Sequence, residues 1–202
     1  QTIFIIIIRK LLQSTLALTC AGILNFLSPS LYASDYWQQY AHYNMDIKLD
    51  VDAKTVGGTT IIEYTNNSPD ILYNIYMHLY PNAFQLGSVK YREFKQKYGR
   101  LPRAAQFLKG YEDSFSKIDI HQFEIVSNGT VLSDTFQIDD TILSAELRNG
   151  LKPGNSLTIE LDWTHYVGEQ VERAGRVESQ YNMAQWYPKL VVYDEQGWHN
   201  LP

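Results

Sequence analysis

Apolar and polar side chains alternate strictly in two segments of the chain, and this alternation predicts β-strands. In residues 43–52 every odd-numbered position is apolar or aromatic and every even-numbered position is polar. Residues 157–163 follow the same pattern. Successive side chains of a strand point to opposite faces of its sheet, so a period of two indicates one buried face and one wet face. Both segments are therefore expected to border a core.

Segments rich in β-branched and aromatic residues predict further strands between turn signals. These segments are residues 59–65, 71–80, 116–126, 136–138 and 142–147, and turn residues cluster at 54–58, 66–70 and 152–155. The strongest hairpin signal is Asn128-Gly129, which should pair residues 123–126 with the segment through Val131 and Leu132. No stretch repeats at the period of a solenoid. The chain is therefore expected to be all-β.

Polar helix formers replace the strand pattern between residues 88 and 113. Residues 91–98 and 103–109 carry most of them, and Gly99 and Pro102 interrupt the run. We therefore expect a short helical insertion near 88–113. Its lysines and arginines indicate a solvated face, with contact to an anionic partner or to another domain as the alternative.

The last patterned stretch, residues 181–198, combines five aromatic side chains with the β-branched pair Val191-Val192. These residue types favour strands. Pro188 has no N–H to donate to a ladder, so the strand should be split there or should lie at a sheet edge. A turn is expected at residues 194–197. The preceding residues 166–180 are polar and predict a loop that is flexible or faces a ligand.

Composition bounds the class of protein and its partners. The chain has 202 residues, of which 45% are hydrophobic and 19% are charged. These values suit one globular domain with a sizeable core. The formal net charge of -5 provides no basic surface for phosphate backbones, so we expect no nucleic-acid partner.

The N-terminal residues have the order of a secretory signal peptide. The basic pair Arg9-Lys10 precedes the apolar residues 11–27, and a small residue, Ala33, stands before the polar Ser34. We expect a signal peptide at residues 1–33 and a domain at 34–202, located outside the cytoplasm as a secreted or periplasmic protein. The alternative is an uncleaved membrane anchor, so contact with a membrane is expected only through this segment. Cys20, the single cysteine, lies inside it.

The histidines give no metal motif. A zinc site needs about three converging ligands, typically two histidines one helical turn apart and a carboxylate. The five histidines are scattered, and none has a second histidine three or four residues away. We therefore expect this chain to hold no zinc of its own. His78, in an aromatic strand, is expected to be a structural residue.

Three short blocks resemble one enzyme family. They are Asn182-Met-Ala-Gln-Trp-Tyr-Pro-Lys189, Val192-Tyr-Asp-Glu195 with Gly197-Trp198, and His78-Leu-Tyr-Pro-Asn-Ala-Phe84. They are similar to the N-terminal domain of bacterial M1-family zinc metallopeptidases, the gluzincin aminopeptidases, and the similar region runs from about residue 36 to the end. The resemblance implies a saddle-like twisted antiparallel sheet packed on a smaller sheet. It also implies that a catalytic domain follows, whose H-E-x-x-H helix binds zinc.

The resemblance places two residues at a substrate site. In the family a glutamine on a strand of this domain lines the pocket for the first residue of the substrate, and the matching position is Gln185. Many members hold the substrate's α-amine with an acid two residues further on. That position is Tyr187 here, and a phenol is a far weaker partner for an ammonium than a carboxylate is. The implied partners are a peptide substrate and the intramolecular catalytic domain.

Two other readings of the sequence remain open. A free-standing secreted β-sandwich could bind sugars or peptides through exposed tyrosines and tryptophans, without catalysis. An interaction domain of a cell-envelope assembly would fit the same signal and sheet pattern.

Overall fold

The computed structural model describes residues 36–102, 104–105, 108–109, 115–169 and 174–202, and two antiparallel sheets make up most of this part of the chain. The strands of the larger sheet are β1 (Tyr40–Asp50), β2 (Thr55–Thr65), β4 (Lys117–Ser127), β5 (Thr130–Ser133) and β8 (Ser156–Tyr166). Those of the smaller sheet are β3 (Leu72–His78), β6 (Gln137–Asp139), β7 (Ile142–Leu151) and β11 (Lys189–Leu190). Residues 1–33, for which the sequence predicts a signal peptide, lie outside the described residues, and so does Cys20.

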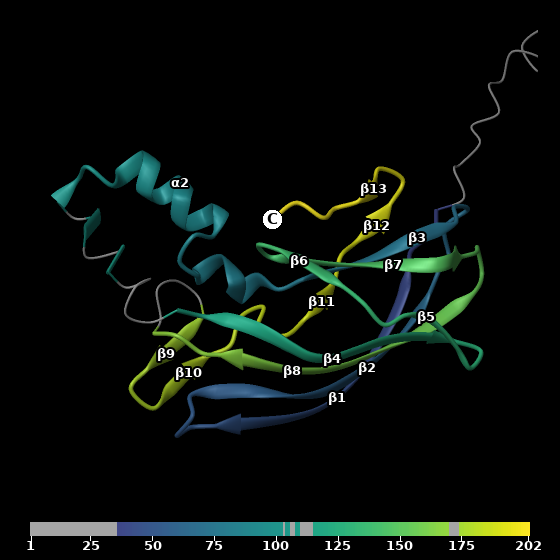
Figure 1. Ribbon diagram of the computed structural model, residues 1–202, viewed down its shortest axis with the longest axis horizontal. Helices are drawn as coiled ribbons and strands as arrows, with labels where there is room; N and C mark the ends of the chain where they lie inside the picture. Colours follow the sequence, from purple (N-terminus) through teal and green to yellow (C-terminus); the bar gives the residue numbers. More distant parts are fainter. Residues whose placement is uncertain (1–35, 103, 106–107, 110–114, 170–173) are drawn as a thin grey trace, which may run out of the picture. The chain divides into compact units, whose positions relative to one another are not determined.

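The strand order confirms the expected pairing of a larger with a smaller sheet. The orders are β1-β2-β8-β4-β5 and β11-β3-β7-β6, and every pairing is antiparallel. In Figure 1 the larger sheet lies below β3, β7 and β6. Two small hairpins complete the β-structure: β9 (Gly175–Val177) with β10 (Gln180–Asn182), and β12 (Tyr193–Asp194) with β13 (Gly197–Trp198). The predicted all-β fold is confirmed.

The core lies between the two sheets and follows the predicted alternation. Every odd-numbered residue of β8 from Leu157 to His165 is buried, as the pattern of residues 157–163 predicts. From the smaller sheet, Ile75, Met77 and Leu143 are fully buried against this row. Burying apolar side chains of this size stabilises the fold by about 1.5–3 kcal/mol each.

Gly57 and Gly58 do not form the predicted turn at residues 54–58. They lie within β2, and the turn is formed earlier, ending at Lys54. A Cβ on Gly57 would overlap the carbonyl oxygen of Trp163 on one side, and a Cβ on Gly58 would overlap that of Asp46 on the other. The two glycines therefore serve close approach of neighbouring strands rather than a change of chain direction.

The hairpin predicted at Asn128-Gly129 is confirmed. Asn128 has a φ of 49° and Gly129 a φ of 74°, the left-handed pair that a two-residue hairpin turn requires. Val126 pairs with Val131 across it, and Ser127 with Thr130. The turn matches the right-handed twist of the flanking strands, so it sets the register of β5 on β4.

A short helix forms within the predicted insertion. The 3-10 helix η1 (Tyr80–Phe84) follows β3, and α2 (Val89–Tyr98) follows η1. Ser88 caps α2, because its Oγ accepts a hydrogen bond from Tyr91 N at 3.1 Å. In Figure 1 α2 stands beside the sheets rather than between them. The second predicted stretch, residues 103–109, lies only partly within the described residues.

Two buried asparagines connect the sheets. Asn66, which follows β2, donates from Nδ2 to the carbonyls of Asp70 and Leu151 at 2.8 and 2.9 Å. Its Oδ1 accepts hydrogen bonds from Ser68 N and Oγ. Asn82 in η1 accepts a hydrogen bond from Ile118 N at 2.8 Å and donates to the carbonyl of Asp140 at 3.2 Å. Each amide thus joins segments that belong to different sheets.

The C-terminal stretch is split at Pro188, as predicted. Strand β10 ends at Asn182, and β11 begins directly after Pro188 at the edge of the smaller sheet. The predicted turn at residues 194–197 connects β12 to β13. Trp198 then packs its ring against Tyr64, Tyr76 and Tyr193, at centroid distances of 6.5, 5.5 and 5.1 Å. These contacts hold the hairpin on the aromatic edge of the core.

Candidate functional site

The bend between β10 and β11 contains both residues that the sequence predicts for a substrate site. Gln185 lies within it with an exposed side chain, and Tyr187 follows two residues later, half-buried. The backbone of Gln185 has a φ of 52°, in the left-handed region. A residue with a Cβ is about 1–2 kcal/mol less stable there than in the right-handed region, so the surrounding packing must hold this bend.

Aromatic packing fixes the residues that follow Gln185. The ring of Trp186 lies 5.8 Å from that of Trp163 and 5.4 Å from that of Tyr187. Trp163 is fully buried, and its Nε1 donates a hydrogen bond to Thr60 Oγ1 at 2.9 Å. Aromatic pairs of this kind contribute about 0.5–1.5 kcal/mol beyond their burial. The core therefore holds the bend from one side.

Tyr43 on β1 supports the other side of the bend. Its ring meets that of Tyr187 edge-on at 5.9 Å, and its Oη accepts a hydrogen bond from Leu190 N at 2.9 Å. Burial raises the pKa of Tyr43 to about 12; the Leu190 N–H opposes this shift, and nearby Tyr187 adds to it. The phenol stays neutral near pH 7, so Tyr43 positions the bend without contributing charge.

The chemistry available at the bend is that of an exposed amide on a fixed backbone. The amide of Gln185 can donate and accept hydrogen bonds, which matches the groups of a peptide backbone. The ring of Tyr187 packs on Tyr43 and Trp186, so it can form a wall but brings no negative charge. Sequence reasoning pointed to Gln185 and Tyr187, but it missed the left-handed backbone and the support from Tyr43.

A serine and a histidine that sequence reasoning did not connect meet at the end of β8. Ser116 Oγ lies 2.8 Å from His165 Nε2. His165 is only 1% exposed, and burial lowers its pKa to about 4, opposed in part by the nearby backbone of Trp186. A general base works best with a pKa near the operating pH, so this ring is poorly suited to take a proton from Ser116. We interpret the pair as a structural hydrogen bond.

His78 also occupies a structural position. It lies on β3 opposite Lys189 of β11, and its ring stacks on that of Tyr80 at 4.5 Å. Burial lowers the pKa of His78, and the charge of Lys189 lowers it further. The ring is therefore mainly neutral near pH 7.

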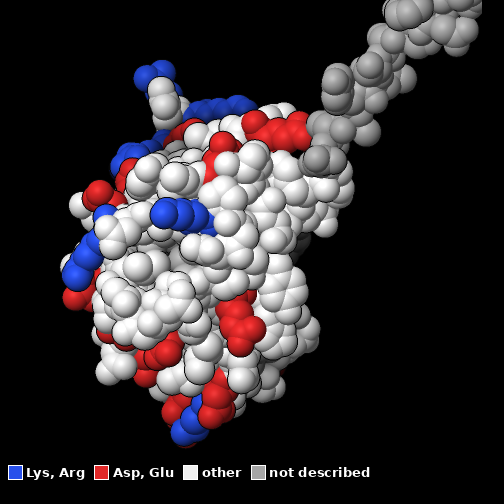
Figure 2. Space-filling view, turned by 90° about the vertical axis from the view of Figure 1, so that its right-hand side faces the viewer, with Lys and Arg blue, Asp and Glu red and all other residues white. Residues whose placement is uncertain are grey.

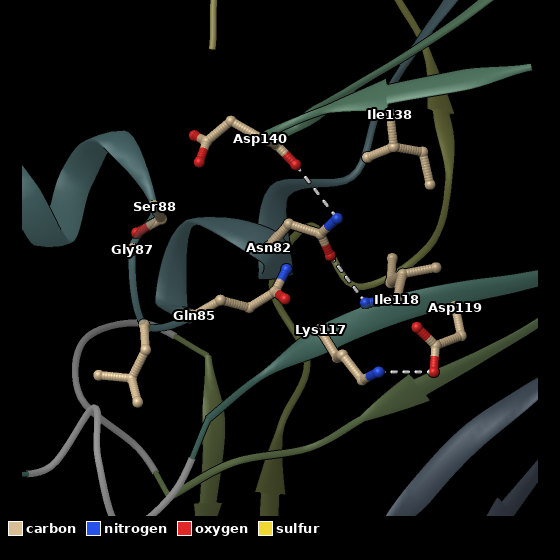
Figure 3. Close-up of a pocket in the computed structure, with 10 residues that line it drawn as sticks. Asn82, Gln85, Gly87, Ser88, Lys117, Ile118, Asp119, Ile138 and Asp140 are labelled. Carbon is tan, nitrogen blue, oxygen red and sulfur yellow. Dashed lines mark hydrogen bonds and ion pairs between the residues drawn. The ribbon is translucent and has the colours of Figure 1, made fainter.

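A pocket of about 320 Å³ opens where η1, the start of β4 and the turn between β6 and β7 meet (Figure 3). Its polar groups are largely paired with one another or with the backbone. Asp140 Oδ1 accepts a hydrogen bond from Val89 N at 3.0 Å, and Lys117 forms an ion pair with Asp119 at 2.8 Å. The amide of Asn82 spans the floor between Ile118 and Asp140. We interpret this pocket as a junction of the fold.

Neither a metal cluster nor a membrane span is found within the described ranges. No group of three or more His, Cys, Asp or Glu side chains among those residues could hold a metal ion. No helix in the same part of the chain is long and apolar enough to cross a membrane. On the face shown in Figure 2, acidic and basic side chains are interspersed with a majority of uncharged ones.

Comparisons with known proteins assign no family and no role to this site. No family model matches the chain, and no curated protein matches it.

Proposed function

We propose that this chain is the substrate-side β-domain of a secreted or periplasmic M1-like zinc peptidase, and that Gln185 borders the bound peptide. The observation that carries the proposal is the backbone of Gln185: an exposed glutamine in the left-handed region, on a bend held by Trp186 and Tyr187. A non-glycine residue in such a conformation often marks a functional site. The blocks around residues 78–84 and 182–198 that resemble the family support the same reading.

Each residue of the bend has its own role in this proposal. The amide of Gln185 hydrogen-bonds the backbone of the peptide, and Tyr187 forms the adjoining wall of the pocket. Zinc, which activates water in the family, is assigned to the catalytic domain that the resemblance places after this one. No step of the proposal runs through a metal held by the residues described above.

The binding-module alternative needs exposed tyrosines and tryptophans. Tyr36, Tyr40 and Tyr73 are exposed, but the tryptophans are not. All four tryptophans are buried or half-buried. All four pack on other aromatic rings of the fold. We therefore favour the peptidase proposal over a module that grips sugars or peptides with tryptophan.

The first experiment is to read the coding frame past the codon for Pro202. The proposal expects an H-E-x-x-H motif and a downstream glutamate within roughly the next 200 residues, about one further domain. A stop codon at that point would contradict it and leave a β-module without the catalytic part.

The second experiment tests Gln185 within the protein that this longer frame encodes. Gln185→Ala and Gln185→Gly should each lower kcat/KM for peptide substrates at least about tenfold, because one hydrogen bond to the transition state is lost. Gln185→Gly should fold at least as stably as the unchanged protein, because glycine accepts a positive φ. A loss of activity in this variant is therefore expected to reflect the missing amide rather than misfolding.

Glu178 provides a matched control. It also has a φ of 52° and an exposed side chain, in the turn between β9 and β10. Glu178→Gly relieves the same backbone conformation and should leave kcat/KM unchanged within about twofold. Equal effects of Gln185→Gly and Glu178→Gly, or no effect of Gln185→Gly beyond about twofold, would remove Gln185 from the substrate site.

A further inference from the structure

Strand β1 leaves one long edge of the larger sheet open. It is the terminal strand in the order of that sheet, and β2 is its one partner among the described strands. The pairing of β1 with β2 continues from Tyr40 to Asp50 without a register shift. The other side of an edge strand presents N–H and C=O groups that can pair with a further strand.

Gly58 shows which backbone groups of β1 face the open edge. A Cβ on Gly58 would overlap the carbonyl oxygen of Asp46, so this carbonyl points toward β2. In an antiparallel strand, successive residues direct their N–H and C=O groups alternately to the two sides. The backbone groups of Met45, Ile47 and Leu49 therefore point away from β2, toward the open edge.

The inward side chains of β1 become more exposed to solvent toward the end of the strand. Tyr43, Met45 and Ile47 are half-buried on the core side. Leu49 continues the same row, but it is 45% exposed. The open edge is thus bordered by apolar surface that the described fold does not cover.

The outward side chains of β1 include two opposite charges next to each other, and a third charge follows at Asp50, whose carboxylate accepts a hydrogen bond from Ala53 N. Asp46 and Lys48 are both exposed and lie on the same face of the strand. Neither of them forms an ion pair with any other residue of the described ranges. A strand with this sequence of charges can match a second strand of the same sequence that runs the other way.

We propose that two copies of this chain pair through their β1 edges, antiparallel, around a two-fold axis at Ile47. In this register Asp46 of each copy stands opposite Lys48 of the other. On the core side, Met45 of each copy stands opposite Leu49 of the other. The exposed apolar side chains are then covered, and both charges gain a partner.

The charges select this register over its neighbours. An axis at Asp46 would place the two Asp46 carboxylates directly opposite each other, and an axis at Lys48 would do the same with the two ammonium groups. Like charges directly opposite across a strand pair are destabilising. Of these three axes, the one at Ile47 alone gives two opposite-charge pairs.

The extent of the contact predicts a weak dimer. One strand edge covers far less than the roughly 1,200–2,000 Å² that stable protein interfaces bury. We therefore expect reversible association that increases with protein concentration and weakens as salt is added.

Sedimentation velocity of the full chain over a concentration series tests the proposal. Asp46→Lys and Lys48→Asp each place like charges opposite one another at both contacts, and each should weaken self-association at least about tenfold. An equimolar mixture of the two variants restores two opposite-charge pairs, and so does the double variant D46K/K48D. Both should associate about as well as the unchanged chain. Glu160→Lys, the same charge change on the exposed face of β8, is the control and should have little effect.

Restored association in the mixture and in the double variant would identify β1 as the edge that pairs. Association through any other segment would persist in both single variants, and this outcome would overturn the proposal. A chain that stays monomeric at a few hundred micromolar, about a hundredfold above a micromolar Kd, would also overturn it. A mixture that does not associate would reject the register. Circular dichroism checks that each variant keeps the β-structure of the unchanged chain.

Discussion

Acid should destabilise this fold through one buried imidazole, that of His165. Its pKa is lowered by burial from 6.5 to about 4, so between these values the unfolded chain binds a proton that the folded chain excludes. Stability is therefore complete above about pH 6.5 and decreases as the pH falls toward 4. From these two pKa values, the loss is about 2 kcal/mol at pH 5 and reaches about 3 kcal/mol below pH 4.

The perturbation that isolates this group is His165→Gln, which can still hydrogen-bond Ser116 but does not titrate. Urea unfolding followed by tryptophan fluorescence gives the free energy of unfolding at several pH values. The unchanged chain should lose about 2 kcal/mol more than the variant between about pH 7.5 and pH 5. His78→Gln is the control, and it should change the pH dependence less because His78 is only half-buried. Parallel curves for the unchanged chain and His165→Gln would refute the reasoning.

Two further predictions concern residues whose neighbours the fold defines. Asn66→Ala should lower the free energy of unfolding by about 3 kcal/mol in the same urea assay, because buried groups lose their hydrogen bonds. Asn67 is exposed, so Asn67→Ala should lower it by less than about 1 kcal/mol. Equal losses would contradict the role of Asn66. Gly58→Ala should cost about 3 kcal/mol or more, because φ is 151° and the new Cβ meets the carbonyl of Asp46. Gly87→Ala, with a φ of 82° and open space around the Cβ, should cost about 1–2 kcal/mol; the reverse order would contradict the steric argument.

Local sequence patterns predicted those parts of the fold in which one physical rule acts alone. The alternation in β8 follows from a strand with one buried face, and the Asn128-Gly129 hairpin follows from backbone conformations that few residue pairs adopt. The Gly57-Gly58 pair was wrongly assigned to a turn because a second rule acted there. Glycine also permits close strand approach, and only the neighbouring strands reveal which use applies.

The candidate site could be proposed from its residues, but its geometry could not be predicted. The resemblance indicated Gln185 and Tyr187, but a glutamine is not a residue type that signals a left-handed backbone. The residues next to Gln185 pack on Trp163 and Tyr43, which are distant in sequence. The contact between Ser116 and His165 was missed for the same reason, since it crosses 49 residues. The hairpin of β9 and β10, residues 175–182, was missed because its short strands carry few of the β-branched and aromatic residues that mark the equally short segment 136–138.

The two connecting asparagines give the sandwich a cooperative character. Asn66 bonds the chain near the end of β7, at Leu151, and Asn82 bonds it just before the start of β7, at Asp140. The sheets are thus tied at both ends of the same strand, so neither end can open first without breaking a buried amide's hydrogen bonds. We therefore expect the amide protons of Ser68 and Ile118, which donate to these side chains, to belong to the slowest-exchanging class, released only when the whole domain unfolds.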